Sequence, residues 1–118
     1  MLKNIEEYEI ISEIPEKCLI IKVRQEVVDE KGLYDAVRIA WRLNGENSQK
    51  ADFILAVVDS IVKEVYKNIK WEKAESGRYQ FTAWTANDDI REKYIYKRIP
   101  KKYREKGMEN PCLYTFNQ

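Results

Sequence analysis

The sequence predicts an α+β domain built on a small, mostly antiparallel, curved sheet or partly open barrel, flanked by two to three helices. Three observations lead to this fold class. Residues 53–58 (FILAVV) are continuously apolar, as expected for a covered strand. Residues 78–84 alternate between apolar and polar side chains, as in a half-exposed strand. Short polar segments separate the apolar runs, and sequential strands joined by short loops favour antiparallel pairing.

The chain of 118 residues is long enough for one domain with a real core, so we expect a single domain over 1–118. No apolar run approaches the roughly 20 residues of a membrane span, and the first residues carry no secretory signal. We therefore expect a cytoplasmic protein with no membrane partner. Cys18 and Cys112 are then expected as buried thiols, with a disulfide between two paired terminal strands as the alternative.

The first half of the chain predicts one strand and one helix. Residues 18–23 (CLIIKV) are apolar and β-branched, which indicates a buried strand. The charged residues 25–31 predict a loop that ends at Gly32. Residues 32–44 predict a helix, because apolar side chains recur there on one helical face: Leu33, Val37 and Ala40.

Residues 53–58 and 61–71 predict a hairpin joined by the two-residue turn Asp59-Ser60. In its second strand we expect one face to carry three large apolar residues: Val65, Ile69 and Trp71. In the third strand, residues 78–84, the expected inner face carries Tyr79, Phe81 and Ala83, and the open face carries an Arg and a Trp.

The last third of the chain predicts two short helices and a final strand. Residues 85–89 look like a helix start, with Thr85 or Asn87 as the cap and an inner face of Ile90 and Tyr94. Pro100 suits the first turn of a helix over 100–106, with Gly107 as its C-terminal cap. Residues 112–116 (CLYTF) predict a last strand, so the expected order is β-α-β-β-β-α-β.

The sequence disfavours catalysis and metal binding. It contains no His, which is the commonest general base and metal ligand, and its two Cys lie far apart. It contains neither GxxxxGK[ST] nor GxGxxG, so a phosphate-cradling glycine loop is not expected. We therefore expect no cofactor, no metal and no catalytic residue.

Aromatic and basic residues make the candidate binding sites. Tyr34, Arg38 and Trp41, with Arg42 beside them, share a helical stripe that would form a flat cationic surface for stacked bases. Alternatively, Trp41 packs at the border of the core and Arg38 pairs with Asp35.

Two further candidates lie later in the chain. Arg78 and Trp84 share the open face of the third strand, after Trp71, unless the C-terminal helices cover that face and Trp84 belongs to the core. Residues 91–106 are strongly basic, include Arg98 and are interleaved with Tyr, which suits a phosphate backbone. Alternatively, this run is only solvated or faces the acidic residues 1–30.

Several segments together carry a family resemblance: LYDAVRIAWRL, ADFILAVVDSIVKEVY, Trp71, GRYQF, IREKYIYKRIPKKY and GMENPCLY. From Gly32 onward the chain resembles a family of small, uncharacterised bacterial and phage proteins. Ser60 stands where that family favours Gly, and Tyr79 where it favours Trp. The order of elements is similar to that of small PUA-like barrels, the group that includes ASCH and EVE domains and binds RNA or modified bases.

These observations predict a PUA-like domain that binds nucleic acid (RNA or DNA), a nucleotide or a modified base without catalysis. The expected ligand-binding residues are Tyr34, Arg38, Trp41, Arg42, Trp71, Arg78, Trp84 and Arg98. One alternative is a protein-interaction module, for example a phage-encoded inhibitor that docks on a host protein. A nucleotide-processing enzyme that uses carboxylates and Arg is the third, least favoured, alternative.

Overall fold

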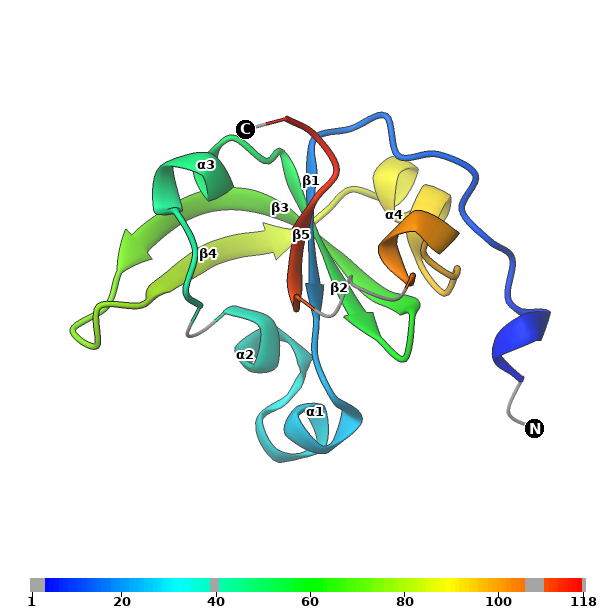
Figure 1. Ribbon diagram of the computed structural model, residues 1–118, viewed down its shortest axis with the longest axis horizontal. Helices are drawn as coiled ribbons and strands as arrows, with labels where there is room; N and C mark the ends of the chain where they lie inside the picture. Colours follow the sequence, from blue (N-terminus) through cyan, green and yellow to red (C-terminus); the bar gives the residue numbers. More distant parts are fainter. Residues whose placement is uncertain (1–3, 39–40, 106–109, 118) are drawn as a thin grey trace.

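The computed structural model contains one five-stranded sheet with short helices packed around it (Figure 1). The structure describes residues 4–38, 41–105 and 110–117. The strands lie in the order β4-β3-β2-β1-β5, and they are β1 (Cys18–Lys22), β2 (Phe53–Val58), β3 (Ile61–Lys73), β4 (Tyr79–Thr85) and β5 (Cys112–Tyr114). The helices are η1 (Ile5–Glu7), α1 (Gln25–Lys31), α2 (Leu33–Arg38), α3 (Gly45–Gln49), α4 (Asp88–Tyr94) and η2 (Lys101–Tyr103). None of the helices in these ranges is long and apolar enough to cross a membrane.

The predicted α+β class and mostly antiparallel sheet are confirmed. β1 pairs in parallel with β2, whereas β1 with β5, β2 with β3, and β3 with β4 are antiparallel. The sheet is not closed, because β4 and β5 remain its two edges. It nevertheless curls, since Phe81 of β4 and Tyr114 of β5 pack in the same core cluster.

Apolar residues cover both faces of the sheet because successive side chains of β1 point in opposite directions. Cys18 and Ile20 face a core beneath α4, which we call the α4-side core. Leu19 and Ile21 face a second core beneath α2 and α3, the α2-side core. Cys18 belongs to the first core and Cys112 to the second, and both thiols are free, so the alternative of a disulfide is wrong.

Two irregularities in β3 change which side chains face which core. The pairing shifts at Lys63 against β2 and at Ile69 against β4, so each residue is extra in its ladder. A bulge of this kind reverses the alternation that follows it. Val65 therefore packs in the α4-side core, Trp71 in the α2-side core, and Ile69 is exposed. The predicted common face of these three residues is wrong, although the predicted hairpin is confirmed.

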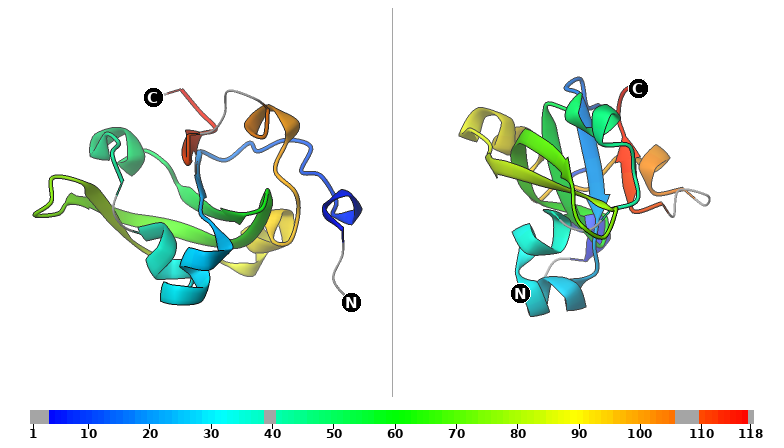
Figure 2. Two further views of the ribbon diagram at one scale, coloured as in Figure 1. Left: turned by 60° about the horizontal axis from the view of Figure 1, so that its bottom comes forward. Right: turned by 90° about the vertical axis from the view of Figure 1, so that its left-hand side faces the viewer.

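The hairpin and the third strand follow the local sequence. Asp59 and Ser60 adopt φ values of 51° and 68°, the positive values that a tight hairpin turn prefers. Phe81 and Ala83 are buried on one face of β4, as predicted. Figure 2 shows the far end of the β3–β4 hairpin projecting from the rest of the sheet.

The segment between β1 and β2 differs most from the prediction. Residues 25–31, predicted as a loop, form α1, and Gly32 ends it with φ of 85°. Residues 32–44 do not form one helix. α2 covers Leu33–Arg38, and Asn44 begins α3, because its side chain accepts hydrogen bonds from the N–H groups of Glu46 and Asn47. Ala40, expected on the inner helical face, lies outside the described residues.

The C-terminal third matches the prediction in order but not in length. Asn87 precedes α4, and Tyr94 is 1% exposed in the α4-side core with Ile90 beside it. Pro100 precedes only the three-residue η2, which is shorter than the helix expected over 100–106. Gly107, the expected cap, lies outside the described residues.

Candidate ligand-binding site

The outer edge of β4 is covered by side chains from α2. The Ala83 N–H donates to the Tyr34 hydroxyl over 3.0 Å, and Arg38 Nε donates to the Phe81 carbonyl over 3.2 Å. Beyond α2, Trp41 pairs through its backbone with Tyr79 over 2.9 and 2.8 Å. An edge strand otherwise presents unpaired N–H and C=O groups, so this segment closes the edge with both side chains and backbone.

Tyr34 and Arg38 are engaged within the fold. The Tyr34 ring packs against Tyr66 and Phe81 with centroids 5.2 and 6.0 Å apart. The Arg38 guanidinium lies 5.7 Å from the Tyr34 ring centre, and it bonds to a backbone carbonyl rather than to Asp35. Tyr34 and Arg38 therefore lie side by side, as the predicted cationic stripe requires, but both side chains form hydrogen bonds with the backbone of β4.

Trp41, Arg42 and Arg78 come together in one groove of about 530 Å³, which we call the Trp41 groove. Its opposite wall consists of Asn110, Pro111 and Cys112, at the start of the other edge strand. Because the sheet curls, residues from its two edges line the same groove. The sequence separates Arg78 from Cys112 by more than thirty positions, so no local pattern signals that they meet.

The indole of Trp41 is held in a fixed orientation. It is half-buried, its Nε1–H donates to the Val37 carbonyl over 2.6 Å, and its backbone pairs with Tyr79. Arg42 and Arg78 are exposed, and in the described part of the chain neither guanidinium has an ion pair. Burial raises the pKa of Cys112 to about 12, so the wall opposite the arginines is uncharged at neutral pH.

Trp71 lies elsewhere, in the α2-side core. It is 8% exposed, its ring centre lies 5.0 Å from that of Phe81, and its indole N–H has no partner within the described ranges. It borders a separate hollow of about 420 Å³ with Gly45 and Tyr79. Gly45 is packed directly under the Tyr79 ring, where a Cβ atom would come within 2.3 Å of a ring carbon.

Trp84 and Arg98 occupy two further places. Trp84 is 67% exposed, so the alternative that helices cover it is wrong; it borders a hollow of about 330 Å³ with Phe53 and Lys67. Arg98 is half-buried, and its backbone bridges those of Ile10 and Ile61. Of the eight predicted ligand-binding residues, the structure thus brings three into one groove and distributes the other five.

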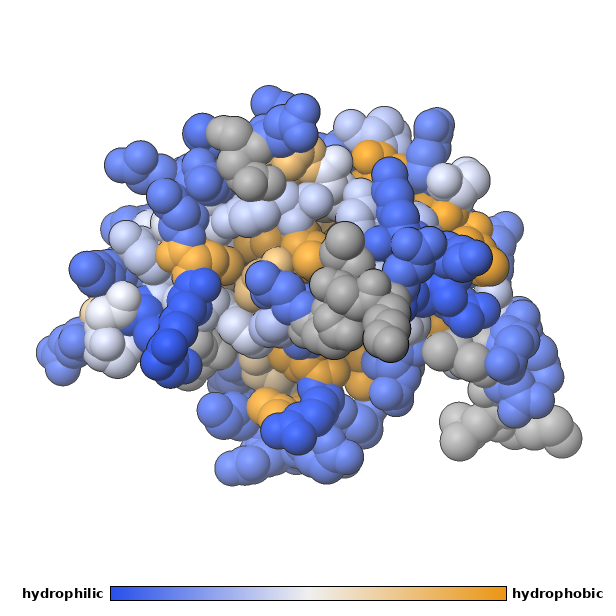
Figure 3. Space-filling view, in the orientation of Figure 1, coloured by the Kyte–Doolittle hydropathy of each residue, from blue (hydrophilic) through white to orange (hydrophobic). Residues whose placement is uncertain are grey.

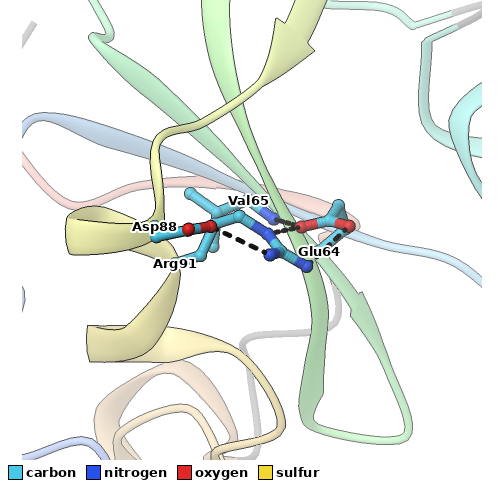
Figure 4. A network of polar contacts seen from close by, with 4 residues as sticks. All are labelled: Glu64, Val65, Asp88 and Arg91. Atoms are coloured by element: carbon cyan, nitrogen blue, oxygen red, sulfur yellow. Dashed lines mark hydrogen bonds and ion pairs between the residues drawn. The ribbon is translucent and has the colours of Figure 1, made fainter.

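The basic run 91–106 divides into two halves. In the first half, Lys97 pairs with Glu9 over 2.9 Å, Lys93 pairs with Glu16, and Arg91 pairs with Glu64 over 2.7 Å (Figure 4). Figure 4 also shows Asp88 on α4, which lies 3.6 Å from Arg91. Two of these carboxylates belong to the acidic residues 1–30, so the alternative that the two charged segments face each other holds for this half.

Burial and hydrogen bonding shift the pKa values within this network. Burial raises the pKa of Glu16, but hydrogen bonds from Lys93 and Tyr94 outweigh it, and the net pKa lies below the usual 4.5. Burial, with the hydrogen bond to Glu16, raises the pKa of Tyr94. The hydrogen bond to Glu64 raises the pKa of Arg91. The first half of the run is therefore neutralised internally.

No group of three or more His, Cys, Asp or Glu side chains that could hold a metal ion occurs in residues 4–38, 41–105 and 110–117. Comparisons with family models, curated proteins and solved structures found no match to this chain.

Proposed function

We propose that this chain binds nucleic acid, a nucleotide or a modified base without catalysis, as a PUA-like domain would, and that the Trp41 groove is the binding site. The observation that carries the proposal is the convergence of one oriented indole and two exposed guanidiniums, Arg42 and Arg78, in a single groove. Aromatic faces stack on bases, and guanidiniums bind phosphates and base edges.

The proposed division of roles follows from burial. Trp41 is restrained by its hydrogen bond to Val37, so little conformational entropy would be lost when a base stacks on its accessible face. Stacking of one base contributes about 1–3 kcal/mol. Arg42 and Arg78 would bind the phosphate or the base edge, since both are exposed beside the indole.

Fluorescence anisotropy with labelled RNA and DNA oligonucleotides of about 12 nucleotides, and competition by free nucleotides, tests the proposal. We expect Arg42→Gln/Arg78→Gln to weaken binding at least about tenfold, since two charge-assisted contacts are lost. The matched control is Arg24→Gln/Lys31→Gln, which removes the same charge from exposed residues flanking and within α1. If the wild-type chain binds none of these ligands, or if both double variants bind equally, the proposal is wrong.

A protein-interaction module is the second candidate, and Trp84 favours it. Trp is among the side chains most enriched at the centres of protein interfaces, and the exposed Trp84 borders a hollow with Phe53 and Ile90. If the chain docks on a host protein in this way, Trp84→Ala should abolish stoichiometric recovery of one partner in a pull-down. Trp84→Ala should leave oligonucleotide binding at the Trp41 groove unchanged.

A further inference from the structure

The second half of the basic run gathers around η2. Arg98 and Arg104 flank this turn, and Lys101 and Lys102 lie on it; we call the four residues the η2 basic cluster. Figure 3 shows strongly hydrophilic side chains gathered over the part of the surface where η2 lies in Figure 1. The cluster is fixed to the sheet, because Ile99 N–H donates to the Ser60 carbonyl and the Lys22 ammonium donates to the Tyr103 carbonyl.

No acid in the described part of the chain forms an ion pair with this cluster. The contrast with Arg91, Lys93 and Lys97, each of which has a carboxylate partner, lies within one continuous basic segment. The basic residues of the first half therefore stabilise the fold through ion pairs. The charges of the second half remain available to bind an anion.

The two arginines of the cluster lie close to each other. Arg104 Nε donates to the Ile99 carbonyl over 2.8 Å, which holds the guanidinium beside the residue that follows Arg98. Burial lowers the pKa of Arg104, and the positive charge of Arg98 lowers it further. Two neighbouring cations thus repel each other in a partly buried place.

Arg98 also has an unused donor. Its Nε–H is buried, and no acceptor for it exists in residues 4–38, 41–105 and 110–117. A buried donor without an acceptor costs about 1–3 kcal/mol, and neighbouring like charges add to the cost. An anion that binds both guanidiniums would offset the repulsion between them, and it would also satisfy the unused donor once the Arg98 side chain turns its Nε–H toward the anion. A tetrahedral phosphate suits the planar donor fork of Arg.

We infer that the η2 basic cluster is a phosphate-binding site in which Arg98 and Arg104 hold one phosphate group and the exposed Lys101 and Lys102 attract it. The phosphate belongs either to a nucleotide's polyphosphate or to a nucleic-acid backbone, since both present the same oxygens. The site is separate from the Trp41 groove and does not depend on it. Lys22 lies between the two sites, because its N–H donates to the Pro111 carbonyl and its ammonium to the Tyr103 carbonyl.

Titration of the ¹⁵N-labelled chain with sodium pyrophosphate tests the site directly, with the arginine Nε–H signals as the readout. We expect the Arg98 and Arg104 signals to shift together and to saturate below about 10 mM pyrophosphate. The Arg91 signal should not move, because Glu64 already occupies that guanidinium. Unshifted Arg98 and Arg104 signals at this concentration overturn the inference, and this measurement needs no variant that has to fold.

Variants then separate charge from geometry. Arg98→Gln/Arg104→Gln should weaken pyrophosphate binding at least about tenfold, and Arg98→Lys/Arg104→Lys should restore only part of it, since Lys lacks the planar fork. Arg24→Gln/Lys31→Gln, with the same change of charge elsewhere, should bind pyrophosphate like the wild type. Equal affinity of the cluster and control variants contradicts the inference.

Oligonucleotide binding distinguishes the two phosphate sources and keeps the two proposals apart. For a backbone phosphate, Arg98→Gln/Arg104→Gln should reduce the slope of log affinity against log salt by about 1. For a nucleotide polyphosphate, that slope should stay unchanged while a nucleoside triphosphate competes with pyrophosphate. If no oligonucleotide or nucleotide binds but pyrophosphate still shifts both arginines, the proposed function and both assigned sources of the phosphate are wrong, whereas the phosphate site itself stands. If oligonucleotides or nucleotides bind but pyrophosphate shifts neither arginine, only the phosphate site is refuted.

Discussion

The Glu16 carboxylate neutralises part of the basic run 91–106, because it pairs with Lys93. Glu16 lies two residues beyond the segment 8–14 (YEIISEI), and its carboxylate contacts both Lys93 and Tyr94 on α4. Hydrogen bonds from these two donors hold the pKa of Glu16 below 4.5 although burial opposes this. The ionised form of Glu16 is therefore stabilised by folding.

The lowered pKa of Glu16 predicts an acid-dependent loss of stability. A carboxyl with a lower pKa in the folded state contributes stability that is fully present above about pH 4.5 and is lost as pH falls through the folded pKa. Glu16→Gln should therefore lower the free energy of unfolding by about 1 kcal/mol at pH 7, and the difference from wild type should shrink below pH 4.5. Urea unfolding between pH 3 and pH 7 measures this.

The control for this measurement is Glu75→Gln, an exposed carboxylate in the β3–β4 loop. Its effect on the free energy of unfolding should stay within about 0.5 kcal/mol. A constant difference between wild type and Glu16→Gln across the whole pH range would show that the Glu16 carboxylate is not coupled to folding.

At the scale of elements, α2 and β4 form one unit. Two side chains of α2 occupy backbone groups along the edge of β4, so α2 protects an edge that would otherwise be open to pairing with another chain. Trp41 continues this protection and at the same time lines the groove. The element that closes the sheet edge is thus also the one that positions the candidate site.

This arrangement predicts that Tyr34 acts on stability rather than on ligand binding. Tyr34→Phe removes the acceptor of the Ala83 N–H, and we expect it to cost about 1 kcal/mol and to speed hydrogen exchange at Ala83. Oligonucleotide affinity should not change. Tyr96→Phe, at a residue that is 60% exposed, is the matched control and should leave both measurements unchanged. If Tyr34→Phe weakens oligonucleotide binding and leaves the free energy of unfolding unchanged, Tyr34 is a ligand contact after all.

At the scale of the whole molecule, the curled sheet separates two cores and places one cysteine in each. Burial raises the pKa of both Cys18 and Cys112 to about 12. Cys112 also lines the Trp41 groove, so its accessibility depends on the sheet keeping its curl.

Both thiols should consequently be inert in the folded protein. The thiolate is the reactive form, and a pKa of about 12 leaves very little of it at pH 8. With Ellman's reagent at pH 8 we expect negligible reaction of the native chain and release of two equivalents in about 6 M guanidinium, which unfolds most domains. Cys18→Ser, measured in parallel, assigns any native reaction to Cys112. Rapid native reaction of Cys112 would show that the Trp41 groove opens in solution, and rapid reaction of Cys18 would show that the α4-side core opens.

The local features of the fold could be predicted from the sequence. The hairpin over residues 53–71, the buried face of β4 and the start of α4 each depend on side chains within a few positions of one another, so pattern and turn chemistry suffice. The sequence pattern does not predict the division of residues 32–44 into α2 and the segment before α3, because the contacts of α2 with β4 and the capping by Asn44 compete with the helical pattern.

Long-range pairing determines the rest. The shifts at Lys63 and Ile69 arise only when β3 pairs with two different strands. The shift at Ile69, which lies between Val65 and Trp71, places these two residues on opposite faces. Which basic side chains are neutralised depends on where the fold places Glu9, Glu16 and Glu64. The sequence by itself therefore determined which aromatic and basic residues were candidates for the site. The tertiary structure decided that Trp41, Arg42 and Arg78 lie together, because the curl of the sheet brings its two edges to one groove.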